Sequence, residues 1–137
     1  MGRILVVDDE DAIRHSLQRR LEREGHTVHT ASAAAAGMEK IQSGEASYDL
    51  VITDMSMEEG ESGMQMLCAA LERDPDIQVI VLTAYGNVRN AVECMQKGAS
   101  DYVEKNIPDV DVFELLVIKA ERALIQRSCR LQARNAA

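Results

Sequence analysis

Four short runs rich in valine, isoleucine and leucine recur along the chain, and each ends beside a residue with a reactive side chain. The runs cover residues 3–7, 50–53, 78–82 and the shorter 101–104. Such runs are typical of parallel strands that are buried on both faces. The reactive residues that follow them are Asp8-Asp9, Asp54, Thr83-Ala84 and Lys105. We therefore expect four strands to present these groups at their carboxyl ends.

Segments with helical periodicity separate the runs, and a fifth strand is expected at residues 26–30. Three of the expected helices begin near polar residues suited to N-capping, namely Ser32, Asn87 and Asp111. Three end at a glycine: Gly25, Gly44 and Gly98. Five alternating strand and helix units predict an α/β fold, a doubly wound parallel sheet with helices on both faces.

The length of 137 residues, 46% of them hydrophobic, predicts one compact domain. The net charge of −8 argues against nucleic-acid binding, because that affinity comes mainly from Lys and Arg. No apolar run approaches the roughly 20 residues that span a bilayer, and no leader pattern opens the chain. We therefore expect a cytoplasmic protein that contacts neither nucleic acid nor membrane directly.

The carboxyl ends of parallel strands meet at one edge of the sheet, so Asp8, Asp9 and Asp54 are expected to lie together. Mutual repulsion of three carboxylates favours a hard divalent cation, for which Mg²⁺ is the natural choice. Asp54 could then act as a nucleophile toward a phosphoryl group, while Lys105 and Thr83 bind its oxygens. Each residue alone has an ordinary alternative, such as an acidic N-cap for Asp8-Asp9. Their joint occurrence, each after its own strand, favours the site.

The chain resembles the receiver domains of two-component response regulators, over about residues 2 to 125. The matching strings are ILVVDDE at 4–10, DLVITDM at 49–55, VIVLTAYG at 79–86 and GASDYVEK at 98–105. The resemblance implies a flavodoxin-like sheet of order 2-1-3-4-5 and a signalling domain that is not an enzyme in the usual sense. The LTAYG string further resembles receivers of transcription activators of the nitrogen-regulation group.

The resemblance also implies specific roles. Asp54 would accept phosphate from a sensor histidine kinase or a phosphotransfer protein. Asp9, Asp54 and the backbone carbonyl of Ser56 would bind Mg²⁺ directly, and Asp8 would bind it through water. Thr83 and Tyr102 would then switch the surface made by residues 87–97, 100–103 and 111 onward, which could contact an output domain, an effector protein or a second copy of the chain. Two further positions, Ser56 and Tyr85, would set the lifetime of the phosphoryl group.

Two departures from the family pattern leave an alternative open. The loop at residues 57–63 lacks the usual proline, carries Glu58, Glu59 and Glu61, and has one residue more than the family pattern. Asn106 follows Lys105 where the family commonly has a cis proline, so either the bond is trans and the lysine points elsewhere, or strain is tolerated. A phosphate-independent binding module would fit these changes. A phosphohydrolase is disfavoured, because Ser56 stands where a second acid is expected.

The last helix is expected to run to about Arg134, which is longer than one sheet requires. We predict a receiver domain at residues 1–125, followed by a helical extension or linker at 126–137. Apolar residues in this helix are spaced alternately by four and three, which suggests a short coiled seam interrupted at Arg127. An ordinary helix with a basic end is the alternative.

Overall fold

The computed structural model describes residues 2–44, 46–55, 62–84 and 86–136. The elements follow one another as β1 (Arg3–Val7), α1 (Asp11–Arg23), β2 (Thr27–Ala31), α2 (Ala34–Gln42), β3 (Leu50–Asp54), α3 (Ser62–Arg73), β4 (Gln78–Thr83), α4 (Val88–Gln96), β5 (Asp101–Glu104) and α5 (Val112–Ala136). All pairings are parallel, in the order β2-β1-β3-β4-β5. The predicted fold and strand order are confirmed.

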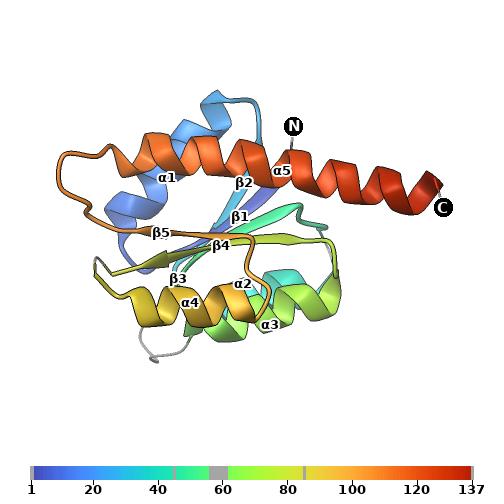
Figure 1. The fold of residues 1–137 in the computed structure, drawn as a ribbon. Coiled ribbons are helices and arrows are strands. Elements are labelled where there is room, and N and C mark those ends of the chain that lie inside the picture. The colour runs from blue at the N-terminus through green and yellow to red at the C-terminus, as the bar shows by residue number, and fades with distance from the viewer. Residues whose placement is uncertain (1, 45, 56–61, 85, 137) are drawn as a thin grey trace.

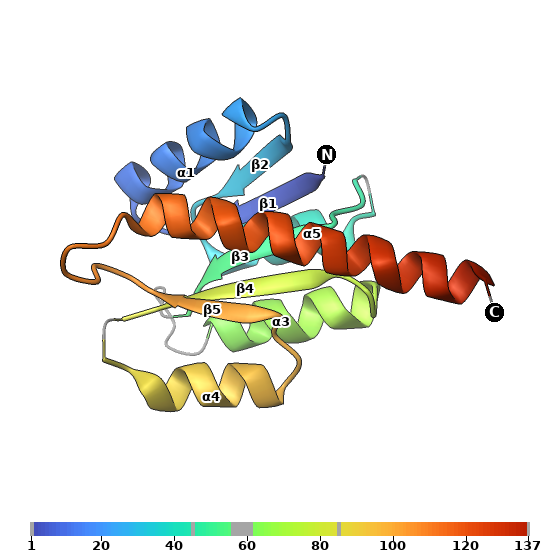
Figure 2. The same ribbon diagram turned by 45° about the horizontal axis from the view of Figure 1, so that its top comes forward.

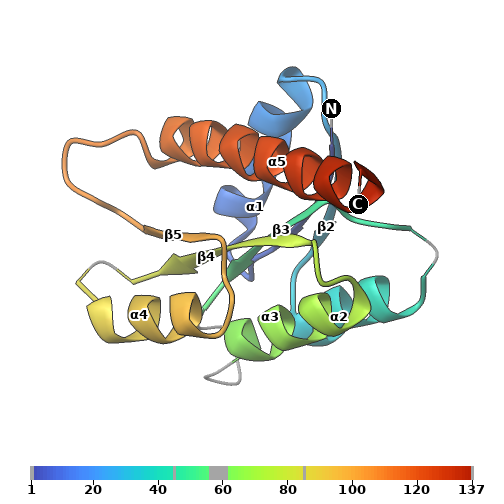
Figure 3. The same ribbon diagram turned by 45° about the vertical axis from the view of Figure 1, so that its right-hand side comes forward.

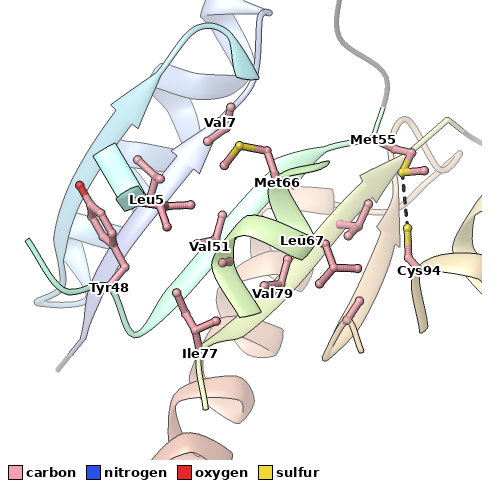
Figure 4. Close-up of a cluster of buried hydrophobic side chains, with 14 of the residues drawn as sticks. Leu5, Val7, Tyr48, Val51, Met55, Met66, Leu67, Ile77, Val79 and Cys94 are labelled. Carbon is pink, nitrogen blue, oxygen red and sulfur yellow. Dashed lines mark hydrogen bonds between the residues drawn. The ribbon is translucent and has the colours of Figure 1, made fainter. Parts of the chain in front are cut away.

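Two helical layers cover the sheet, with α1 and α5 on one face and α2, α3 and α4 on the other (Figure 1, Figure 3). Alternate residues of β1 enter opposite cores, because successive strand side chains point to opposite faces. Ile4 packs in the core beneath α1 and α5, and Leu5 packs in the core beneath α3. The second core is shown in Figure 4, where the thiol of Cys94 in α4 donates to the sulfur of Met55 at 3.4 Å.

The two central strands are buried along their whole length, which explains their continuous apolar sequence. Each extends one residue past its predicted end, so that β3 includes Asp54 and β4 includes Thr83. The register pairs Asp54 with Leu82 and Thr83 with Glu104. The reactive groups are therefore held by the regular hydrogen bonding of the sheet itself.

The helix ends follow the predicted capping with one exception. Asn87 accepts a hydrogen bond from the backbone of Asn90, and Asp111 caps α5 by accepting from Phe113 and Glu114. The expected cap at Ser32 is wrong. The strand β2 runs to Ala31, so that the extended residue Ala33 takes the N-cap position and no side chain caps α2.

The β2 strand lies one residue later than predicted, because His26 belongs to the turn after α1. The His26 backbone amide donates to Leu21, and its ring bonds the amide of Gly2 and the carboxylate of Glu121. The glycines at the ends of three helices, Gly25, Gly44 and Gly98, have positive φ as expected of helix C-termini.

Helix α5 continues without a break to Ala136 and projects past the sheet (Figure 2). Its final turns are ion-paired to loops at the amino edge of the sheet. Arg127 contacts Asp49 and Asp74, both at 2.9 Å, and Arg134 contacts Asp76 at 3.1 Å. Within the described ranges no helix is long and apolar enough to cross a membrane.

Candidate functional site

The predicted acids and the predicted lysine meet at the carboxyl edge of the sheet. Asp8 follows β1, Asp54 ends β3, and Lys105 follows β5. The Lys105 Nζ atom lies 2.9 Å from Asp54 Oδ2 and 3.0 Å from Asp8 Oδ2. A third carboxylate, Glu10 Oε1, lies 3.3 Å from the same nitrogen. Lys105 therefore bridges acids that two different strands, β1 and β3, bring together.

The backbone after Lys105 differs from the pattern in which a cis proline follows the lysine. The peptide bond between Lys105 and Asn106 is trans, and Asn106 has a φ of 57°. Asparagine enters this left-handed region more readily than most residues. The Lys105 amide donates to the carbonyl of Thr83 at 2.7 Å, which extends the β4–β5 pairing. The expectation that a trans bond would point the lysine elsewhere is thus wrong, because sheet pairing up to Lys105 sets its direction before the turn.

Burial strengthens the charge interactions between the acids and the lysine of this site. Asp8 is fully buried, Asp54 is 6% exposed and Lys105 is 8% exposed. Burial raises the pKa of Asp8 above its ordinary value, against the lowering effects of the Glu10 backbone amide and Lys105. Burial also lowers the pKa of Lys105, but its hydrogen bonds and charge interactions with Asp54 and Asp8 outweigh this and raise it. Lys105 is therefore a fixed cation at neutral pH.

The acids fit a magnesium ion by their chemistry and spacing. One carboxylate oxygen from each of Asp8, Asp9, Glu10 and Asp54 lies within 4.8 Å of the others. These are hard oxygen ligands, and Asp9 and Glu10 are exposed, which leaves room for the waters that Mg²⁺ retains. Ser56, predicted to offer its carbonyl, lies outside the described residues.

The two predicted switch residues lie on adjacent strands. Thr83 is fully buried, and its hydroxyl has no hydrogen-bond partner among the described residues. Tyr102 is half-buried in β5 and pairs in register with Val81 of β4. A buried hydroxyl without a partner is unfavourable. Thr83 is therefore suited to bind a group that enters the site. Tyr85 lies outside the described residues, so its role stays a prediction.

Two residues near the site were not assigned from the sequence. Glu10 joins the acid cluster and contacts Lys105. Arg14 is buried on the same face of α1 as Leu17 and Leu21 and donates to the backbone carbonyl of Asp8 at 2.9 Å. The spacing of Arg14 from the two leucines, three and seven residues, could have revealed a charge in the apolar stripe.

Comparison with known proteins agrees with this fold. The family described as the response regulator receiver domain matches residues 4–117. The chain therefore belongs to the receiver domains of two-component response regulators.

Among its relatives is the photosynthetic apparatus regulatory protein RegA of Rhodobacter capsulatus, 32% identical over 118 residues that cover 86% of this chain and 62% of RegA. The alginate biosynthesis transcriptional regulatory protein AlgB of Pseudomonas putida is 35% identical over 134 residues, which cover 96% of this chain and 28% of AlgB. The chain thus spans about three fifths of RegA and less than a third of AlgB.

Solved structures show the same similarity. A response regulator receiver domain protein from Clostridium thermocellum superposes with a TM-score of 0.82 at 32% identity, covering 94% of this chain and 98% of the other. NtrX from Brucella abortus superposes with a TM-score of 0.86 at 28% identity, covering 99% of this chain and 30% of NtrX. The similarity to NtrX is consistent with the narrower resemblance of the LTAYG string.

Proposed function

We propose that this receiver accepts a phosphoryl group on Asp54 from the phosphohistidine of a sensor kinase or phosphotransfer protein. The observation that carries the proposal is the Lys105 ammonium held within 3.0 Å of both Asp54 and Asp8. An Asp54 carboxylate oxygen forms a bond to phosphorus while the phosphorus–nitrogen bond breaks and the donor leaves as free imidazole. Such transfer depends on positioning and charge stabilisation, which Lys105 supplies at the reacting oxygen.

Magnesium would be held by Asp8, Asp9 and Asp54 together with the backbone carbonyl of Ser56. The ion supplies positive charge that offsets the acids and the incoming phosphoryl oxygens. Lys105 would move from the Asp54 carboxylate to a phosphoryl oxygen, and the buried Thr83 hydroxyl would donate to another. Asp8, whose carboxylate is fully buried, would help to hold the ion through water.

Phosphorylation would be read through the surface of α4, β5 and α5. Movement of Thr83 toward the phosphoryl group would let Tyr102 turn inward, and this requires a bias of only a few kcal/mol between two arrangements. Val92 and Met95 on α4 and Ile118 on α5 are exposed apolar residues of that surface. It would contact an output domain, an effector protein or a second copy of the chain.

The proposal is tested by intact-mass spectrometry after incubation with a small phosphodonor, with and without Mg²⁺. We expect one labile phosphoryl adduct that requires the ion and is absent from Asp54→Asn. Asp109→Asn is a matched control, because Asp109 is exposed and lies outside the site. A folded chain that forms no adduct would instead support the phosphate-independent binding module.

A further inference from the structure

A charged residue, Arg14, lies almost completely inside the protein next to the site. It is 9% exposed and shares the inner face of α1 with Leu17 and Leu21. Arginine is rarely buried to this degree unless its guanidinium has partners. Its partners therefore indicate what the residue does.

Among the described residues, the guanidinium of Arg14 bonds the turn that carries the acids. Its Nη1 atom donates to the backbone carbonyl of Asp8 at 2.9 Å, and its Nη2 atom pairs with Asp11 Oδ1 at 2.6 Å. The Arg14 backbone amide donates to the carbonyl of Glu10 at 3.0 Å. The backbone bond is the ordinary one of a first helical turn, so the Arg14 side chain itself bonds two residues of the 8–11 turn, Asp8 and Asp11.

The same turn is also fixed from its other side. The Asp8 amide donates to Ala31 of β2, and the Asp8 carboxylate accepts from the Glu10 amide through Oδ1 at 2.9 Å. The backbone carbonyl of Asp8 has Arg14 as its side-chain donor. Because the planar guanidinium donates in two directions, it can hold both Asp8 and Asp11. A lysine could not reach both oxygens with the same rigidity.

The two cations near the acids differ in what they bind. Lys105 pairs with carboxylate oxygens, so it competes with any ion for the same atoms. Arg14 instead bonds the backbone of Asp8 and leaves both carboxylate oxygens of Asp8 to other partners. It therefore brings positive charge next to the acids without occupying a carboxylate oxygen of Asp8.

We propose that Arg14 is a positioning residue for the magnesium site and holds the Asp8-Asp9 turn in its ion-binding conformation. This inference rests on the proposed function, since it assumes that the acids bind Mg²⁺. Loss of a residue that orients metal ligands typically lowers metal affinity by about 10- to 100-fold. We expect Arg14→Gln to weaken Mg²⁺ binding by at least about tenfold and Arg14→Lys to have a smaller effect.

The test is calorimetric titration of the whole chain with Mg²⁺, comparing the parent with Arg14→Gln, Arg14→Lys and the control Arg19→Gln. Arg19 is exposed on the same helix, so its replacement should leave binding unchanged. Circular dichroism checks that each variant is folded. If Arg14→Gln does not fold, Arg14→Lys decides the question.

A second readout separates positioning from general damage to the fold. The rate of phosphoryl adduct formation in Arg14→Gln should return to within about twofold of the parent when Mg²⁺ is saturating. A rate that stays low at every Mg²⁺ concentration, or variants of Arg14 that bind Mg²⁺ like the parent, would overturn the inference alone. A parent chain that binds no Mg²⁺ would overturn both this inference and the metal-dependent function.

Discussion

Replacing Lys105 by Met should destabilise the protein, because it leaves buried acids without their cation. The methionine keeps the apolar stem of the side chain and removes only the ammonium. The ammonium lies 2.9 Å from Asp54 and 3.0 Å from Asp8, whose side chains are 8% and 0% exposed. Removing one partner of a buried ion pair costs about 3 to 5 kcal/mol.

We take the lower end of that range, about 3 kcal/mol, because the exposed Glu10 shows that water reaches one side of the site. Domains of this size are stable by roughly 5–15 kcal/mol, so the variant should still fold. Urea slopes are about 1–3 kcal/mol per molar, so the unfolding midpoint at pH 7 should fall by about 1–3 M. The matched control is Lys40→Met, since Lys40 is exposed on α2.

The pH dependence of this loss of stability follows from the charges of Lys105 and Asp8. While the acids that it pairs with are ionised, the raised pKa of Lys105 means that its contribution is lost only as pH rises from about 10 through its folded value. The raised pKa of Asp8 means that its ionised form destabilises the fold increasingly as pH rises from about 4. The difference between Lys105→Met and the parent should therefore be largest near neutral pH and smaller at pH 3.

Magnesium should restore more stability to Lys105→Met than to the parent, because the ion replaces the missing positive charge. The measurement is urea unfolding followed by circular dichroism, at pH 7 and pH 3, with and without the ion. A variant as stable as the parent at pH 7 without Mg²⁺ would refute the account of Lys105 as the cation that balances buried acids. Equal stabilisation of both proteins by Mg²⁺ would refute the idea that the Lys105 ammonium and the ion balance the same acids.

Three further changes test other parts of the structure by the same urea assay. Asp8→Asn should raise the unfolding midpoint at pH 7 without Mg²⁺ but leave it unchanged at pH 3. The reason is that the raised pKa of Asp8 makes its ionised form unfavourable only as pH increases. A lower midpoint at pH 7 would contradict this. Gly63→Ala should destabilise by about 1–3 kcal/mol, because the new Cβ would lie 2.5 Å from the Met55 backbone; an unchanged midpoint would mean that α3 shifts freely. Arg127→Gln should destabilise the protein by about 1–2 kcal/mol, a value between those of surface and buried ion pairs. It should also speed hydrogen exchange of residues 126–136. The control Arg130→Gln, at an exposed position of the same helix, should do neither.

The sequence predicts the sheet and its reactive edge because both follow from short-range patterns. Each strand has its own apolar run, and parallel pairing then brings the residues after those runs to one edge. The caps at Asn87 and Asp111 are equally local, since each side chain bonds backbone amides two or three residues away. Ser32 fails as a cap because the length of β2, which depends on pairing with β1, decides where α2 can begin.

The remaining features depend on contacts between distant segments. Glu10 joins the site because Lys105, 95 residues away, approaches it. Arg127 is an interruption in an apolar pattern when only its helix is considered, yet in the folded chain it pairs with Asp49, 78 residues away. No local pattern contains the information that these partners meet. The turn at Asn106 differs again. The same lysine can be followed by a cis proline, as is common in the family, or by a trans bond and a residue with positive φ, as here.

The ion pairs of α5 bear on how a signal could leave the domain. The acids of the site lie at the carboxyl ends of the strands, whereas Asp49 and Asp74 precede β3 and β4 at the opposite edge. Arg127 and Arg134 are seven residues apart, which places them on one face of the helix, and both contact that edge. The division of the chain at residue 125 stays a prediction. A segment held by three ion pairs should nevertheless move with the receiver, so a change at the switch surface of α5 would reach its end through a rigid helix rather than a flexible linker.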